Sequence, residues 1–264
     1  MESSEYQQIK LGGLDANQDL IAQWSDLWTS KRWPEEMQRI RNNELEKKYP
    51  GITHVFNSLL NNIPWERKDQ ATEFPIAAAI VRTIMNPEHS SIQYKTLEIV
   101  SKATNMVKQT GISSNHAEKW VIEDALKKLG VEHLPDDCIV VSTVEPCSMC
   151  AGVIANADAT TVIYGASQDD IRGRKVLANG NMKQHRAEPN GYDSNEFINQ
   201  HRHDAGRKVT VEGGCCRNEV LSRMALPGQI NFIKENHDLF KDEESMARIE
   251  SLVQYEKSRF SSVK

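Results

Sequence analysis

Hydrophobic and polar residues follow two different periods along this chain, and the periods predict helices at its start and strands in its middle. A spacing of three or four residues between apolar positions is typical of amphipathic helices. It occurs in two early stretches, 16–28 and 54–63. Between them, 34–48 is predicted as a highly charged helix that begins at Pro34, with Glu35 and Glu36 in its first turn. We expect the first helix to pack on the main domain, with a lid or a dimer contact as the alternatives.

Short apolar runs in the central part of the chain indicate buried strands. They are 75–81, 138–144 and 160–165, and a last strand is predicted at 208–212. The stretch 96–107 mixes apolar and polar residues, so its pattern fits either a strand or a helix. A helix is predicted from about Asn115 to Leu129, closed by Gly130.

A second central helix, at about 148–157, lies between the strands at 138–144 and 160–165. This strand–helix–strand order predicts that the two strands are parallel. Strands separated by helices predict an α/β layered domain over roughly residues 52–225.

Less regular segments divide the chain into three predicted parts. Residues 167–207 are polar and rich in Gly and Asn, and a loop of that length is usually functional or partly helical. A helix begins at about Arg217, and the last 36 residues, 229–264, are charged with a helical pattern. We therefore predict the following division: a helical N-terminal extension at 1–52, a main domain at 53–226 with an insert at 171–207, and a helical C-terminal extension at 227–264.

Composition narrows the class of protein. The 264 residues are 39% hydrophobic and 26% charged, which is ordinary for a globular protein. No apolar run approaches the roughly 20 residues that span a bilayer, and the N-terminus lacks the features of a signal peptide. A cytoplasmic protein without a membrane partner is therefore expected. The net charge of −5 makes a polynucleotide partner less expected than a small molecule.

Five cysteines, an odd number, favour metal binding or free thiols over a disulfide framework. Cys147 and Cys150 are three residues apart at the start of a predicted helix, so their sulfurs should share one face. A helix N-terminus also favours thiolate over thiol. With His116 they supply the three ligands of a catalytic zinc site, which leaves one position open for water.

Glu118, two residues after His116, is not needed as a ligand and suits a general acid and base. Zinc lowers the pKa of bound water from about 15.7 to about 7, and His-x-Glu followed by Pro-Cys-x-x-Cys is the signature of zinc nucleobase deaminases. A Cys-x-x-Cys alone could instead be a redox pair or part of a structural zinc site. Neither Cys138 nor the Cys215–Cys216 pair has ligand spacing, which favours the open, catalytic site.

Over about residues 54–225 the chain resembles the cytidine deaminase superfamily, in the branch of tRNA adenosine deaminase, guanine deaminase and fungal cytosine deaminase. The motifs that carry the resemblance are 75–81, 116–118 and 145–152. The resemblance implies a three-layer α/β/α sandwich with a five-stranded mixed sheet, one zinc ion per subunit and commonly a homodimer. It places the zinc ligands at His116, Cys147 and Cys150 and the proton shuttle at Glu118.

The resemblance also implies two substrate contacts. Asn105, eleven residues before His116, would contact the base, unless it is an ordinary residue at the end of an element. The backbone of Ala117 would polarise the substrate.

Departures from the family pattern bear on the substrate. Relatives acting on tRNA typically read Gly-Ala-Arg-Asp where this chain has Gly-Ala-Ser-Gln at 165–168, and their C-terminal helix is basic where this one is acidic. The leading hypothesis is hydrolytic deamination of a purine or pyrimidine nucleobase, nucleoside or related heterocycle. The alternatives are a tRNA adenosine-to-inosine deaminase and a non-catalytic deaminase-fold binding protein, against which Glu118 argues.

Other residues have a simpler interpretation beside a functional one. His201 and His203, with Arg202 between them, could bind a phosphate or carboxylate, but a solvated loop is the default. Tyr164 and Trp120 could stack on a base, although their placement favours core packing.

Overall fold

The computed structural model describes residues 32–63, 76–85, 95–171, 175–178, 181–184, 188, 191–202 and 207–223. The helix predicted at 16–28, His203 and the C-terminal extension at 227–264 lie outside the described residues. The division of the chain into three parts therefore stays a prediction.

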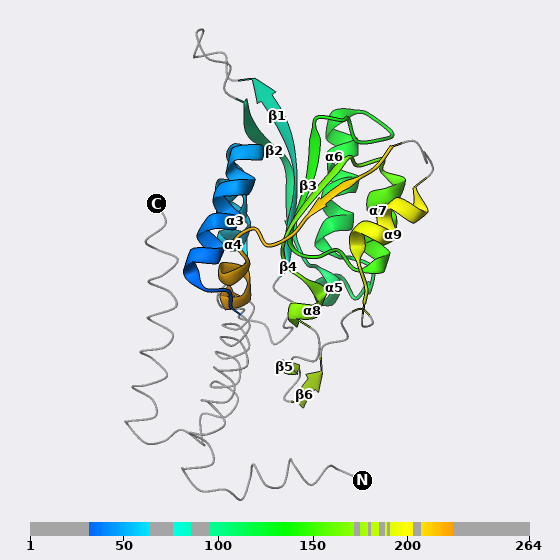
Figure 1. Ribbon diagram of the computed structural model, residues 1–264. Helices are drawn as coiled ribbons and strands as arrows, with labels where there is room; N and C mark the ends of the chain where they lie inside the picture. Colours follow the sequence, from blue (N-terminus) through cyan, green and yellow to red (C-terminus); the bar gives the residue numbers. More distant parts are fainter. Residues whose placement is uncertain are drawn as a thin grey trace, which may run out of the picture.

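A five-stranded mixed sheet forms the centre of the molecule, in the order β2-β1-β3-β4-β7 (Figure 1). Its strands are β1 Ala77–Met85, β2 Lys95–Thr104, β3 Cys138–Val144, β4 Thr161–Ala166 and β7 Thr210–Glu212. β1 is antiparallel to both of its neighbours, whereas β3, β4 and β7 are parallel. The predicted parallel pair and the five-stranded mixed sheet are both confirmed.

The ambiguous stretch at 96–107 is the edge strand β2, followed by a short helix. Glu98 and Lys102 are exposed on this strand, because only its β1 side is paired within the described sheet. An edge strand carries charged residues that a central strand would exclude, and this explains the interrupted apolar pattern. Cys138 is buried and is the first residue of β3.

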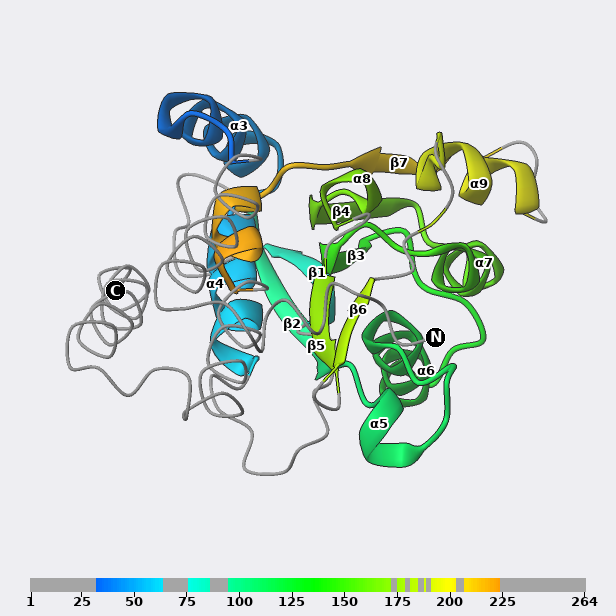
Figure 2. The same ribbon diagram turned by 90° about the horizontal axis from the view of Figure 1, so that it is seen from below.

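Helices cover both faces of the sheet and complete the predicted three layers (Figure 2). They are α3 Glu35–Lys48, α4 Ile52–Asn62, α5 Val107–Thr110, α6 Ala117–Leu129, α7 Ser148–Asn156, α8 Gln168–Ile171 and α9 Ser194–His201. Residues 217–223 are also helical. α4 and residues 217–223 lie on one face with α3 beside them, and α6, α7 and α9 lie on the other. Each described helix is too short or too polar to span a lipid bilayer.

The sheet separates two hydrophobic clusters, and β1 contributes to both. Ala77, Ala79 and Val81 belong to the cluster under α4, whereas Ala78 and Ile80 belong to the cluster under α6 and α7. Because successive side chains of a strand point to opposite faces, a strand buried on both sides reads as a continuous apolar run. This is the pattern that identified it in the sequence.

The insert is partly helical, as predicted, because α8 and α9 lie within or beside it. The sequence did not lead us to expect the two-stranded hairpin of β5 Lys175–Ala178 and β6 Asn181–Gln184. An Asn-Gly pair lies between these strands at 179–180. That dipeptide favours a two-residue hairpin turn, and it is the signal that would have found the hairpin.

α3 is joined to the end of β7 through Glu212. The Glu212 carboxylate accepts hydrogen bonds from Arg41 Nη2 at 3.1 Å and Tyr49 OH at 3.1 Å, and from Lys48 Nζ. Arg41 Nε also donates to the carbonyl of Gly213 at 3.0 Å. These contacts hold α3 to the sheet through charge and hydrogen bonds more than through apolar packing.

Candidate active site

Two helices begin at the same edge of the sheet, and each contributes to one cluster of side chains. His116 is the residue before α6, and Cys147 is the residue before α7, three residues after the end of the strand β3 at Val144. Both have extended backbones (ψ 154° and 168°), as residues that precede a helix do. The helix predicted from Asn115 thus begins two residues later, with His116 at its boundary.

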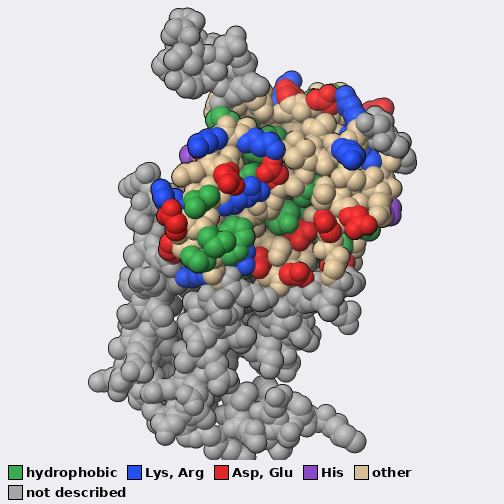
Figure 3. Space-filling model, viewed as in Figure 1, with side chains coloured by type: hydrophobic (Ala, Val, Ile, Leu, Met, Phe, Trp, Pro, Cys, Tyr) green, Lys and Arg blue, Asp and Glu red, His purple; other side chains and the backbone are tan. Residues whose placement is uncertain are grey.

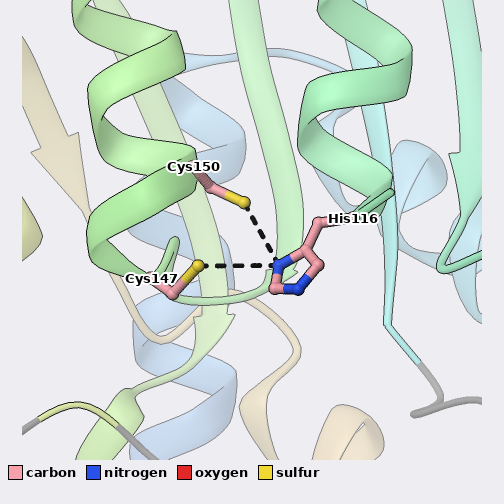
Figure 4. Close-up of side chains that lie close together, drawn as sticks. All are labelled: His116, Cys147 and Cys150. Atoms are coloured by element: carbon pink, nitrogen blue, oxygen red, sulfur yellow. Dashed lines mark hydrogen bonds between the residues drawn. The ribbon is translucent and has the colours of Figure 1, made fainter. Parts of the chain in front are cut away.

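The two cysteine sulfurs face the imidazole ring of His116 (Figure 4). His116 Nδ1 lies 3.5 Å from Cys147 Sγ and 3.4 Å from Cys150 Sγ, and the potential ligand atoms of the three residues are all within 4.8 Å of one another. Two sulfurs and one imidazole nitrogen are the donor set that zinc prefers. This confirms that the domain has a group that could hold a zinc ion.

The pKa values of the two cysteines are shifted in opposite directions. The pKa of Cys147 is lowered to about 4, because Cys150 and His116 hydrogen-bond to its sulfur more strongly than burial disfavours the charge. The pKa of Cys150 is raised by its hydrogen bond to Cys147, by burial and by the neighbouring Glu118. Since zinc binds thiolates, metal binding would displace the proton of Cys150.

Glu118 is buried beside this group, with only 3% of its surface exposed. Its Oε2 accepts from Cys150 Sγ at 3.5 Å, and its Oε1 accepts from Ser142 Oγ at 3.1 Å. Burial raises the pKa of Glu118, and the charge of Cys147 adds to the effect. A divalent cation bound by the cysteines would lower the pKa of Glu118.

Ser142 is a contact that the sequence analysis missed. It lies on β3, is fully buried, and donates directly to the Glu118 carboxylate. Its signal was one of two adjacent hydroxyl residues, Ser142 and Thr143, at the end of an apolar strand. A buried hydroxyl group usually forms a hydrogen bond. The sequence could therefore have indicated that this serine has a polar partner, although not that the partner is Glu118.

Asn105 and Ala117, the two predicted substrate contacts, hydrogen-bond to each other. The backbone N–H of Ala117 donates to Asn105 Oδ1 at 3.1 Å. Since a backbone N–H only donates, the atom facing it is the amide oxygen, and Nδ2 remains as a donor. Asn105 is 6% exposed and comes directly after β2. The structure brings both residues to the start of α6, while their roles toward a substrate stay predictions.

His201, Arg202 and Tyr164, which were also singled out in the sequence, make their contacts outside this cluster. His201 is exposed at the C-terminal end of α9 and stacks on Phe197, with 4.1 Å between ring centroids. Arg202 is buried, and its Nη2 donates to the carbonyl of Asp158 at 2.9 Å. The ring of Tyr164 packs so closely on Gly213 that a side chain at that glycine would collide with it. Tyr164 thus has the packing role that its strand position favoured.

Comparison with known proteins identifies the same family that the sequence motifs indicated. Residues 58–166 match the family model described as the cytidine and deoxycytidylate deaminase zinc-binding region. A tRNA-specific adenosine deaminase of Streptococcus pyogenes is 33% identical over 112 residues, 42% of this chain and 62% of that protein. A guanine deaminase of Bacillus subtilis is 39% identical over 72 residues, 27% of this chain and 46% of that protein. The match thus spans less than two thirds of the length of either relative.

A solved structure of guanine deaminase from Nitrosomonas europaea aligns with a TM-score of 0.40 and 22% identity, covering 57% of this chain and 70% of that one. The relatives include proteins named for a free base and proteins named for tRNA.

Proposed function

This chain carries a deaminase domain of the cytidine and deoxycytidylate deaminase family, and from that premise we propose that it is a zinc-dependent hydrolase. The reaction converts the exocyclic amino group of a nucleobase, nucleoside or related small heterocycle to a carbonyl. Water is consumed and ammonia is released, so that one C–N bond is replaced by one C–O bond.

The observation that carries the proposal is the position of Glu118. Its carboxylate is buried, touches the sulfur of Cys150 and is held by Ser142, yet it is not one of the three residues of the metal group. A protein that only bound its ligand would gain nothing from a buried carboxylate at this place, since burying one is costly. A hydrolase needs it as the group that moves protons.

The residues divide the work as follows. His116 Nδ1 and the sulfurs of Cys147 and Cys150 would hold the zinc ion. When bound, zinc supplies a nucleophile by lowering the pKa of water from about 15.7 to about 7. Glu118 would take one proton from the attacking water and give it to the ring nitrogen of the substrate. It would then take the remaining proton of the added hydroxyl and pass it to the leaving amine, which departs as ammonia. Asn105 Nδ2 donates to an acceptor on the ring, because its Oδ1 is held by Ala117.

Two features support a small substrate over tRNA. The chain has a net charge of −5, and a binder of nucleic acid depends on a basic surface. On the face seen in Figure 3, the basic side chains of the described residues lie among acidic ones rather than in one strip. Deamination of adenosine in tRNA, the activity named for several relatives, is the second candidate. A cytoplasmic location and a homodimer stay predictions.

Release of ammonia from a panel of purine and pyrimidine bases and nucleosides tests the proposal. The Glu118→Ala protein, purified in the same way, is the blank that reports contaminating deaminases. We expect ammonia from at least one member of the panel with the parent and none with the variant. A tRNA stem-loop in a parallel reaction, analysed for inosine, decides between the two candidates. A zinc-loaded parent that is inert on every substrate would contradict the proposed function.

A further inference from the structure

Residues of the insert contact the loop that carries Cys147, on both sides of that cysteine. The hydroxyl of Tyr192 donates to the carbonyl of Pro146 at 2.8 Å, and the backbone N–H of Ser148 donates to Glu188 Oε1 at 2.7 Å. Cys147 lies between these two points. The insert therefore fixes the residue before the ligand and the residue after it.

Glu145 makes the third contact and is the most enclosed of them. It is 5% exposed, and its Oε1 accepts from the N–H and the hydroxyl of Ser194 at 3.1 and 2.8 Å. Its Oε2 accepts from the N–H of Gln168 at 2.9 Å, and the Gln168 side chain donates to the Glu145 carbonyl at 2.6 Å. One buried carboxylate thus joins the loop to the starts of α8 and α9.

The order of the contacts shows how the two segments run. Going from Glu188 through Tyr192 to Ser194, the partners go from Ser148 back through Pro146 to Glu145. Among the described residues, the contacts of the insert are therefore in the reverse order to their partners on the metal-ligand loop. They reach the loop at three points, before and after Cys147, rather than at one.

This arrangement bears on Cys147 more than on Cys150. Cys150 lies within α7, where the hydrogen bonds of the helix fix its backbone. Cys147 precedes the helix and has an extended backbone, so the helix alone does not fix the direction of its side chain. The bond that it does make to the helix, from the Ala151 N–H to its carbonyl at 2.8 Å, holds the backbone, and the contacts of the insert act on the residues before and after it.

We propose that Glu188, Tyr192 and Ser194 form a clamp that positions the Cys147 ligand, so that the insert is part of the metal centre. The proposal rests on the proposed function, in that it takes His116, Cys147 and Cys150 as the zinc ligands. The three clamp residues are positioning residues and touch neither the metal nor the substrate. Loss of such outer contacts typically costs 10- to 100-fold in metal affinity.

The experiment compares two tyrosine-to-phenylalanine variants of the full chain. Tyr192→Phe removes the hydrogen bond to Pro146. Tyr49→Phe removes a matched one, since Tyr49 OH donates to Glu212 at 3.1 Å on the other side of the molecule. The dissociation constant for zinc is measured by competition with a chromogenic chelator. We expect an increase of about tenfold for Tyr192→Phe and no change for Tyr49→Phe.

Two further measurements separate positioning from general stability. Cobalt(II) titration reports the thiolate-to-metal absorption band, which should weaken or shift in Tyr192→Phe alone. Glu188→Gln, which keeps an oxygen that can accept from Ser148, should retain more zinc affinity than Glu188→Ala.

The possible failures differ from those of the proposed function. Equal zinc affinity in the parent and Tyr192→Phe, or an equal loss in Tyr49→Phe, overturns the clamp even if the parent deaminates a substrate. If the parent binds zinc tightly but is inert on the substrate panel, the proposed function is contradicted. The zinc affinities of the parent and the two variants then still test the clamp. A parent that binds no zinc overturns both.

Discussion

Two neighbouring residues of β3 put the same chemical group to different uses on the two faces of the sheet. Ser142 and Thr143 are both fully buried. Ser142 faces α6 and donates to the carboxylate of Glu118, whereas Thr143 Oγ1, on the α4 side, accepts from the backbone N–H of Ala77 at 3.0 Å. One hydroxyl orients a group that would do chemistry, and the other closes a gap in the backbone hydrogen bonding. Their burial is equal, so only their partners tell them apart.

The same contrast holds for the carboxylates of the two faces. Among the described residues, Glu118 hydrogen-bonds to Ser142 and Cys150 and to no cation, and burial raises its pKa. Glu212, at the α3 side, is surrounded by Arg41, Lys48 and Tyr49, and its pKa is lowered. A buried carboxylate without a cation is costly and is typical of sites that do chemistry. A carboxylate with cations serves to join elements.

Glu118→Ala tests this comparison with the largest expected change, which is a loss of turnover. Loss of a general acid and base typically costs 10²- to 10⁴-fold in rate, and this group serves several proton transfers, so turnover should fall by about 10⁴-fold. Zinc content, measured by atomic emission, should stay near one ion per chain. A loss of zinc together with activity would show that Glu118 is structural, and the contrast between the faces would fail.

Cys147→Ser is the counterpart that tests the ligand set rather than the proton shuttle. Serine is a poor zinc ligand compared with a thiolate, so zinc occupancy itself should fall. If zinc occupancy remained at the parent level, Cys147 would not be a zinc ligand. The proposed clamp would then have no role in metal binding.

The third prediction tests the comparison between Ser142 and Thr143 on β3 itself. Ser142→Ala removes a hydrogen bond to a charged group, worth about 1.5–3 kcal/mol. We expect kcat to fall by about tenfold or more, with KM nearly unchanged, because Glu118 remains but is no longer held. Thr143→Val, the matched control, leaves the N–H of Ala77 without its acceptor and should cost about 1–3 kcal/mol of stability.

Kinetics and thermal unfolding of both variants provide the check. Thr143→Val should lower Tm while leaving kcat at the parent value. The reverse result, with Thr143→Val losing turnover and Ser142→Ala only stability, would refute the assignment of roles to the two faces.

The residues that sequence reasoning found are those whose signal is local. Cys147 and Cys150 are three positions apart, and Glu118 follows His116 by two, so each pair lies within one helix start whatever the rest of the fold does. β1 and β3 were found for a similar reason, since burial on both faces leaves a continuous apolar run.

The residues that were missed depend on contacts between distant parts of the chain. Ser142 is 24 residues from Glu118, and Tyr192 is 46 residues from Pro146. No period or spacing connects such pairs, because the fold alone brings them together. The insert carried little pattern for the same reason: its contacts with the loop are made by single polar side chains rather than by an apolar face.

The smallest expected effect concerns the α3 side and its dependence on pH. The pKa of Glu212 is lowered from its ordinary value of 4.5, because the hydrogen bonds and charges of Lys48, Tyr49 and Arg41 together outweigh the opposing effect of burial. A depressed pKa in the folded state means that this group adds stability above about pH 4.5, and that the contribution is lost as the pH falls through the folded-state value.

Glu212→Gln should therefore lower the unfolding free energy by about 1 kcal/mol at pH 7, and the difference from the parent should shrink below pH 4.5. Urea unfolding of both proteins at pH 7 and pH 3.5 measures it, with zinc affinity as the control that should not move. A difference independent of pH would show that Glu212 acts through packing rather than through its charge. A change in zinc affinity would show that the α3 side is coupled to the metal site, and this would contradict the separation between the two faces.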